Sequence, residues 1–337
     1  PARGPPTRAP TGACAAATYP PDFPKRAFEI PIPVVRMVAI ARRGLSPEFL
    51  ADLQGGLLAP IRERVARDQS LCLELREDYI NVYYRGGNVM RVSRSNGGYS
   101  AFFDTKYFQG AVPSMPGARI REASDVAAWL AALPTLKQAM DLAQPGEERE
   151  VQQLILRDNN VGCIARSTDY YICDIEYANH HGRFDLVAVR WPSTPTARKK
   201  QDGHRLVLGE VKVGDGALEG TAGLHAHVDD VNGYLAAPGN LAAIKEEMLR
   251  VFNQKRALGL VDCEKDLTGF SDEPPVLLLV LVNHDPDKSR LRELLRSLPP
   301  SSHAELRIAT GSLLGYGLYD PAILTIDEAL ARFEACI

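Results

Sequence analysis

The neighbouring segments Arg183–Arg190 (RFDLVAVR) and Leu206–Val213 (LVLGEVKV) decide the fold, because each is an apolar run interrupted by charge. Side chains of a β-strand alternate between its two faces. Leu206 and Leu208 therefore lie on one face of the second segment and the valines on the other, so both faces are apolar. This pattern predicts a central strand that is covered on both sides.

Three charged residues interrupt these runs: Asp185 in the first, and Glu210 and Lys212 on one face of the second. Burying a carboxylate or an ammonium group is costly unless the charge is paired, hydrogen-bonded or bound to a metal. One interpretation is a buried ion pair that only holds the sheet together. The other is a functional site, because carboxylates from two adjacent strands are oxygen ligands that suit Mg²⁺.

A helix predicted over residues 147–158 precedes these strands. Apolar residues follow Glu148 at three and seven positions, so this carboxylate lies on the helical face that points towards the sheet. Glu147 falls near that face and Glu150 further from it, which leaves open which of the three acids belongs to the site. Acidic residues in the first turn also stabilise the helix dipole, which is the alternative explanation.

The order of these residues resembles the PD-(D/E)XK nuclease superfamily, which includes restriction enzymes and archaeal Holliday-junction resolvases. The matching positions are Glu148 on the helix, Asp185 on one strand and the Glu210-x-Lys212 pair on the next. Phe184 stands where the motif has proline. The resemblance implies an α/β (α+β) fold of the restriction-endonuclease-like type, with a mixed β-sheet flanked by helices.

The resemblance also implies a Mg²⁺-dependent (endo)deoxyribonuclease, a hydrolase acting on phosphodiester bonds. Asp185, Glu210 and Glu148, with the carbonyl of Val211, would bind Mg²⁺ or Mn²⁺, and Lys212 would orient or activate the attacking water. DNA is expected as the substrate rather than RNA, in phage defence or DNA repair. Activity as a homodimer or with a partner protein is compatible with the sequence.

A non-catalytic module that binds nucleic acid or protein and has retained the nuclease fold is the alternative. Against it, the sequence holds every residue type of the site, whereas a degenerate copy usually loses the lysine or one carboxylate. An enzyme acting on a small phosphorylated substrate is disfavoured, because the chain lacks a phosphate loop such as G-x-x-x-x-G-K.

Three parts of the chain are predicted from composition and periodicity. Residues 1–27 form a flexible Pro/Ala-rich lead-in without the apolar core of a signal peptide. Residues 28–145 form an N-terminal α+β domain for recognition of a substrate or partner, and residues 146–337 form the nuclease-like domain. The turn residues Pro145-Gly146 mark the boundary between these two domains.

Alternation with a period of two from Leu71 to Phe103 predicts a small antiparallel meander in the N-terminal domain, with a hairpin turn at residues 85–88. Its arginines and aromatic residues could hold phosphates and stack bases. They could equally be the half-buried cross-strand pairs of an ordinary sheet. The basic candidates for nucleic-acid contact are two arginines of the meander and three residues between the charged strands: Arg85, Arg91, Arg198, Lys199 and Lys200. The last three could instead belong to a solvated loop.

Several local predictions bear on the fold. Ser46-Pro47 is expected to begin a helix that bends at Gly55-Gly56, and Ser124 and Thr135 are each expected to open a short helix. A strand is expected at Ile323–Ile326. On the strand predicted at Tyr170–Tyr177, the two acids Asp174 and Glu176 are expected on one face. That face is either exposed to water or brings Glu176 near the metal.

The composition is that of a globular protein, with 45% apolar and 24% charged residues in 337. A formal charge of −3 excludes binding of nucleic acid by bulk positive charge, so any such contact must come from local patches. The six cysteines form no C-x-x-C pair, which argues against a zinc module and fits free thiols in the cytoplasm. The longest apolar run, Val276–Val282, is too short to cross a membrane.

Overall fold

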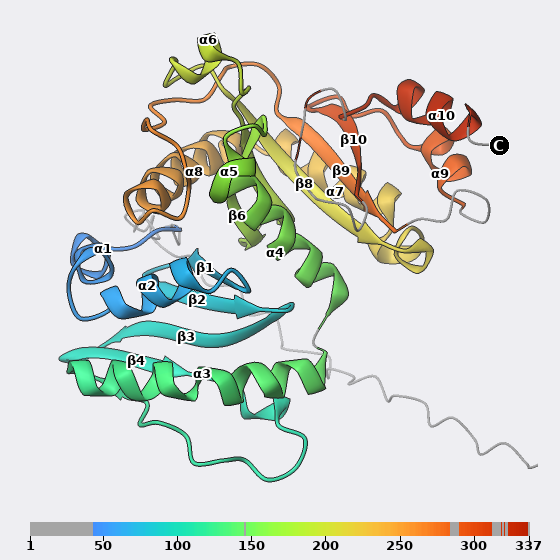
Figure 1. The fold of residues 1–337 in the computed structure, drawn as a ribbon. Coiled ribbons are helices and arrows are strands. Elements are labelled where there is room, and N and C mark those ends of the chain that lie inside the picture. The colour runs from blue at the N-terminus through green and yellow to red at the C-terminus, as the bar shows by residue number, and fades with distance from the viewer. Residues whose placement is uncertain are drawn as a thin grey trace, which may run out of the picture. The chain divides into compact units, whose positions relative to one another are not determined.

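The computed structural model describes residues 43–144, 146–283, 290–311, 318, 320 and 323–335. The predicted lead-in over residues 1–27, the start of globular structure at Phe28 and the boundary residue Pro145 lie outside these residues and stay predictions. Ala41–Ile337 forms one compact unit, which contains two five-stranded sheets and helices (Figure 1). The mixed α/β class is thereby confirmed.

The first sheet has the strand order β1-β2-β3-β4-β5, and every adjacent pair is antiparallel. Its strands are β1 (Leu71–Leu75), β2 (Tyr79–Tyr84), β3 (Gly87–Ser95), β4 (Gly98–Phe102) and β5 (Arg119–Ile120). Arg85 and Gly86 join β2 to β3, both with positive φ, as a two-residue hairpin turn of the primed type requires. The predicted meander is therefore confirmed.

Three helices belong to the same part of the chain: α1 (Pro47–Gln54), α2 (Ala59–Arg67) and α3 (Ala123–Ala143). Helix α1 begins after Ser46 as predicted, but the predicted bend at Gly55-Gly56 is wrong, because α1 ends at Gln54 and α2 is a separate helix that begins at Ala59. The two short helices predicted from Ser124 and Thr135 are wrong, because α3 runs through both with Pro134 in its interior. Buried residues on both sides of the proline pack on one core, and this packing outweighs the local helix-breaking tendency.

The second sheet has the order β10-β9-β8-β7-β6. Its strands are β6 (Tyr170–Ala178), β7 (Arg183–Arg190), β8 (Arg205–Val213), β9 (Val276–Val282) and β10 (Glu305–Gly311). Strands β6, β7 and β8 pair antiparallel, whereas β8, β9 and β10 pair parallel, so the sheet is mixed. Strand β8 lies at its centre, as its apolar faces predicted. The strand predicted at Ile323–Ile326 is wrong: Leu324 makes an isolated bridge, and a helix begins at Ile326.

Helices cover both faces of this sheet. Helix α4 (Glu147–Asn160) packs on the face that carries Val207 and Val211, whereas α7 (Leu224–Ala236) and α8 (Asn240–Ala257) pack on the face that carries Leu206 and Leu208. The shorter helices are α5 (Gly162–Ala165), α6 (Pro195–Arg198), α9 (Leu291–Ser297) and α10 (Ile326–Ala335), with 3-10 turns η1 (Thr105–Tyr107), η2 (Asp215–Ala217) and η3 (Gly220–Ala222). No helix in the described part of the chain is long and apolar enough to span a membrane.

Candidate active site

The predicted site lies where the ladder between β7 and β8 ends. The last pair of this ladder is Leu186 with Gly209. Just beyond it, the Val211 N–H donates a hydrogen bond to Asp185 Oδ2 at 2.8 Å, so the aspartate side chain takes the place of a strand partner. The N–H and C=O of one strand residue point to the same side, and the Val211 carbonyl therefore also faces β7.

Lys212 joins two of the predicted carboxylates. Its Nζ lies 2.6 Å from Glu210 Oε1 and 3.9 Å from Glu148 Oε2. Glu148 comes from the first turn of α4, whereas Glu147 is exposed and Glu150 pairs with an arginine of the β2–β3 turn. Of the three neighbouring acids, the structure therefore brings Glu148 to the site.

His227 is a site residue that the sequence analysis missed. Its Nε2 lies 2.8 Å from Glu210 Oε1 and 3.1 Å from the Ala222 carbonyl oxygen. Both neighbours are hydrogen-bond acceptors, which places a proton on Nε2. Lys212 and His227 thus converge on the same oxygen of Glu210.

A sequence signal for His227 exists in the helix that follows β8. Val231 and Tyr234 come four and seven residues after the histidine, so all three lie on one helical face. Val231 and Tyr234 are buried in the core that also contains Leu208 of β8. Their spacing directs His227 towards the sheet.

Burial and neighbouring charges shift the pKa values of the three carboxyl groups of the site. Burial, together with the charge of Glu210, raises the pKa of Asp185 to about 8, although the hydrogen bond from Val211 opposes the shift. Burial would also raise the pKa of Glu210, but contacts with His227 and Lys212 hold it below its ordinary value. Burial raises the pKa of Glu148 despite the nearby ammonium of Lys212. Asp185 and Glu210 therefore disfavour simultaneous ionisation in the absence of a further cation.

The donor set fits a hard divalent cation. Asp185, Glu210 and the Val211 carbonyl offer oxygen atoms from two adjacent strands, which are the ligands that Mg²⁺ and Mn²⁺ prefer. Burial and the charge of Glu210 both raise the pKa of Asp185, and a divalent cation would offset both by stabilising the ionised carboxylate. No group of three or more His, Cys, Asp or Glu side chains within the described residues is arranged to hold a metal ion. The candidate ligands are two such side chains, Asp185 and Glu210, and the main-chain carbonyl of Val211, with Glu148 beside them.

The basic residues between β7 and β8 lie away from the site: Arg198, Lys199 and Lys200. They follow the end of β7 and precede the start of β8, about five strand residues from Asp185, which is roughly 16 Å at about 3.3 Å per residue. The guanidinium of Arg198 lies 4.6 Å from the ring centre of Tyr171, and its Nη2 donates to the Thr168 carbonyl at 2.5 Å. The structure therefore does not bring this loop together with the carboxylates.

The two arginines of the meander contact other groups of the protein. Arg85 pairs with Asp141 and Glu150, in both cases at 3.0 Å. Arg91 lies over the ring of Tyr79, with its guanidinium carbon 5.0 Å from the ring centre. Several aromatic residues of the meander, Tyr99 and Phe103 among them, are buried in the core of the first sheet. These contacts support cross-strand packing, and the predicted contact with nucleic acid remains a prediction.

Asp174 and Glu176 do not share a face, so that prediction is wrong. A register shift lies between Ile172 and Asp174, and Glu176 has a φ of 53°, which breaks the alternation of the strand. Asp174 is fully buried and pairs with Arg43 and Arg76, so the exposed acidic face is wrong for this residue. Glu176 is exposed, and its charge adds to the raised pKa of Glu148.

A cavity of about 660 Å³ lies outside this site. Its lining includes Cys72, Glu74 and Lys255, and none of the predicted carboxylates of the site. The candidate active site is therefore recognised by its charges, and cavity volume gives no support for it.

No family model matches this chain, and no curated protein or solved structure is similar to it. Any inference about function therefore depends on the residues and their geometry.

Proposed function

We propose that this chain is a metal-dependent nuclease that hydrolyses phosphodiester bonds, with DNA as its substrate. The observation that carries the proposal is the meeting of Asp185, Glu210 and Lys212 at one end of the central strand β8, with Glu148 beside them. The same residue types occur in the same order in the PD-(D/E)XK superfamily. The pKa of Asp185, raised by burial and by the charge of Glu210, adds support, because a divalent cation would stabilise the ionised carboxylate.

Asp185, Glu210 and the Val211 carbonyl are the groups that would hold Mg²⁺ or Mn²⁺, with Glu148 at the edge of the site. When bound, such a cation supplies an acidified water and neutralises charge on the phosphate. The Val211 N–H keeps Asp185 oriented, and its hydrogen bond uses only the oxygen Oδ2. Among the described residues, no hydrogen bond to the other oxygen of Asp185 is seen, so that oxygen can bind a ligand.

Lys212 supplies the positive charge next to the reacting phosphate. Burial would lower the pKa of this ammonium group, but Glu210 raises it above its ordinary value, so Lys212 is charged at neutral pH. A charged ammonium group can hydrogen-bond the attacking water or stabilise the negative charge that develops on a phosphate oxygen. His227 positions Glu210 through the hydrogen bond to Oε1.

Cleavage of supercoiled plasmid and single-stranded DNA in Mg²⁺ or Mn²⁺ tests this proposal. Asp185→Asn and Lys212→Met retain the size of each side chain and remove its charge. Arg205→Lys is the matched control, since this arginine begins β8 at the end opposite the site. Wild type and control are expected to cleave, and each site variant is expected to lose roughly 100-fold or more in rate.

Thermal unfolding of each variant excludes loss of folding as the cause. Equal cleavage by wild type and both site variants would place the activity elsewhere and refute the proposal. Absence of cleavage by wild type, with salt-sensitive DNA binding retained, would favour the non-catalytic binding module.

A further inference from the structure

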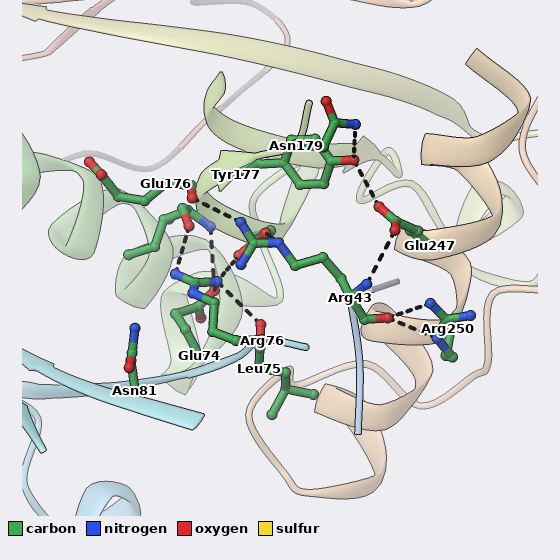
Figure 2. Close-up of polar contacts among 12 residues, drawn as sticks. Arg43, Glu74, Leu75, Arg76, Asn81, Glu176, Tyr177, Asn179, Glu247 and Arg250 are labelled. Atoms are coloured by element: carbon green, nitrogen blue, oxygen red, sulfur yellow. Dashed lines mark hydrogen bonds and ion pairs between the residues drawn. The ribbon is translucent and has the colours of Figure 1, made fainter. Parts of the chain in front are cut away.

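A buried cluster of charges connects the first sheet to strand β6 of the second (Figure 2). Arg76, directly after β1, pairs with Asp174 on β6, and Arg43 pairs with the same carboxylate at 3.0 Å. Glu74 on β1 pairs with Lys255 of α8 at 2.6 Å. Arg76, Asp174, Glu74 and Lys255 are each at most 3% exposed.

The side chains of the cluster also form hydrogen bonds with the backbone of β6. Arg76 Nη2 donates to the Ile175 carbonyl at 2.8 Å, and Arg43 Nη2 donates to the Glu176 carbonyl at 3.0 Å. The Ile175 N–H donates to Glu74 Oε2 at 3.3 Å. Three consecutive peptide units of β6 are therefore held by three charged side chains from outside the second sheet.

Ile175 and Glu176, the residues held by these contacts, lie across from Asp185 of the proposed site. Ile175 pairs with Leu186, and Tyr177 pairs with Phe184, so Glu176 faces Asp185 between these two pairs. The left-handed backbone of Glu176 interrupts the ladder at this point. Arg43 and Arg76 therefore hold β6 in position where its pairing with β7 is irregular.

A second contact links the first sheet to the helix that carries Glu148. The Gly86 N–H in the β2–β3 turn donates to Gln153 Oε1 of α4 at 3.1 Å. A Cβ at Gly86 would collide with the Gly146 carbonyl, just before α4, so the two backbones are in close contact. Both elements that flank the candidate site, α4 and the β6–β7 pair, are therefore held by the first sheet.

Stability alone is a weak reason for such a cluster, because a buried ionic group is often no more stable than apolar residues of the same volume. Its contacts are instead suited to fixing a position, since forked arginines set both the distance and the angle of the backbone that they hold.

We propose that Arg43, Glu74 and Arg76 are positioning residues that set the Asp185 carboxylate through β6, and so couple the first sheet to the site. This inference rests on the proposed nuclease function for its consequence, namely that a displacement of the first sheet changes catalysis. The coupling itself is a property of the metal-free chain and has its own readout.

Hydrogen exchange at the Val211 amide, followed by NMR, provides that readout, because this N–H is bonded to Asp185 Oδ2. Arg76→Lys keeps the charge and removes the forked contact with Asp174 and the Ile175 carbonyl. We expect exchange at Val211 to become roughly tenfold faster or more. The cleavage rate kcat is expected to fall with little change in KM, since substrate contacts are retained.

Arg205→Lys is again the matched control, because Arg205 also makes a forked contact, with Glu305 and the Pro274 carbonyl, at the far end of β8. It is expected to leave exchange at Val211 unchanged. If Arg76→Lys does not fold, Arg43→Lys takes its place, since it removes the contact with the Glu176 carbonyl from a less buried position.

Unchanged exchange at Val211 in the folded Arg76→Lys or Arg43→Lys variant would overturn the coupling, as would an equal acceleration in Arg205→Lys. Failure of the proposed function is a different result: wild type would not cleave DNA, while exchange at Val211 would still respond to Arg76.

Discussion

Asp174 and Asp185 lie on adjacent strands of one sheet, and their surroundings are opposite. Asp174 is fully buried between Arg43 and Arg76, which hold its pKa below the ordinary value although burial alone would raise it. Asp185 is half-buried and receives one backbone hydrogen bond, and its pKa is raised to about 8 by burial and by the charge of Glu210.

The difference is the basis on which we separate a structural charge, Asp174, from the charge proposed to be functional, Asp185. The charge of a carboxylate that is paired with cationic side chains is compensated within the protein. A solvent-accessible carboxylate beside another carboxylate is repelled by it, and a bound cation would relieve this repulsion. Residue type is the same in both places, and the balance of neighbouring charges decides the role.

The largest effect is expected from Asp174→Asn. This change leaves the buried Arg76 and the half-buried Arg43 without a full counter-charge, and breaking a buried ion pair costs about 3–5 kcal/mol in the free energy of unfolding. Asp185→Asn is expected to leave that free energy unchanged or to raise it, because it removes a carboxyl group whose pKa is raised on folding by burial and by Glu210. Urea denaturation of both variants at pH 7 measures the contrast, and equal losses would remove the distinction between the two aspartates.

The second-largest effect is expected from replacing His227, which we propose to position Glu210. Replacing a group that orients a metal-binding carboxylate typically costs about 10–100-fold in metal affinity or activity, and we expect a loss in that range for His227→Ala. His225→Ala is the control on the same helix, since His225 contacts the Leu294 carbonyl and Ser297 instead. Initial cleavage rates at saturating Mg²⁺ compare the two, and similar rates for both variants would exclude a role for His227.

The raised pKa of Asp185 also predicts how the stability of the protein changes with pH. The pKa of Asp185 is raised from 3.8 to about 8, so the folded state binds its proton more tightly between these values. The metal-free wild type therefore loses stability relative to Asp185→Asn as pH rises from 5 to 8, by at most about 1.4 kcal/mol per pH unit. Urea denaturation at pH 5, 6, 7 and 8 measures the difference. Parallel stability curves for the two proteins would contradict the raised pKa.

The smallest effect is expected from the basic loop at the far end of β7 and β8. Changing Lys199 and Lys200 together to serine should alter the cleavage rate by less than about twofold, because the loop lies away from the carboxylates. The salt dependence of DNA binding is the sharper measurement. A decrease in its slope of about one for each lysine would show that the loop contacts phosphate after all.

Much of the second sheet is predictable from sequence, because its charges interrupt otherwise apolar strands. Alternation places Glu210 and Lys212 on one face, and helical spacing turns Glu148 towards them. These relations are local, and the structure brings the residues together at 2.6 Å and 3.9 Å. The apolar faces of β8 likewise predict its central place, which the strand order confirms.

Contacts between distant segments could not be predicted in the same way. The surroundings of Asp174 depend on a register shift and on two arginines, Arg76 and Arg43, that lie 98 and 131 residues earlier in the chain. The continuity of α3 through Pro134 depends on burial against a core whose members are spread along the sequence. Local patterns describe single elements, whereas these features arise where elements meet.

Binding of Mn²⁺, followed by electron paramagnetic resonance of the free ion, distinguishes the two aspartates most directly. Wild type and Arg205→Lys are expected to bind Mn²⁺ in competition with Mg²⁺, and Asp185→Asn is expected to lose this binding while remaining folded. Equal binding by Asp185→Asn, or absence of binding by wild type, would contradict a cation site at Asp185 and Glu210.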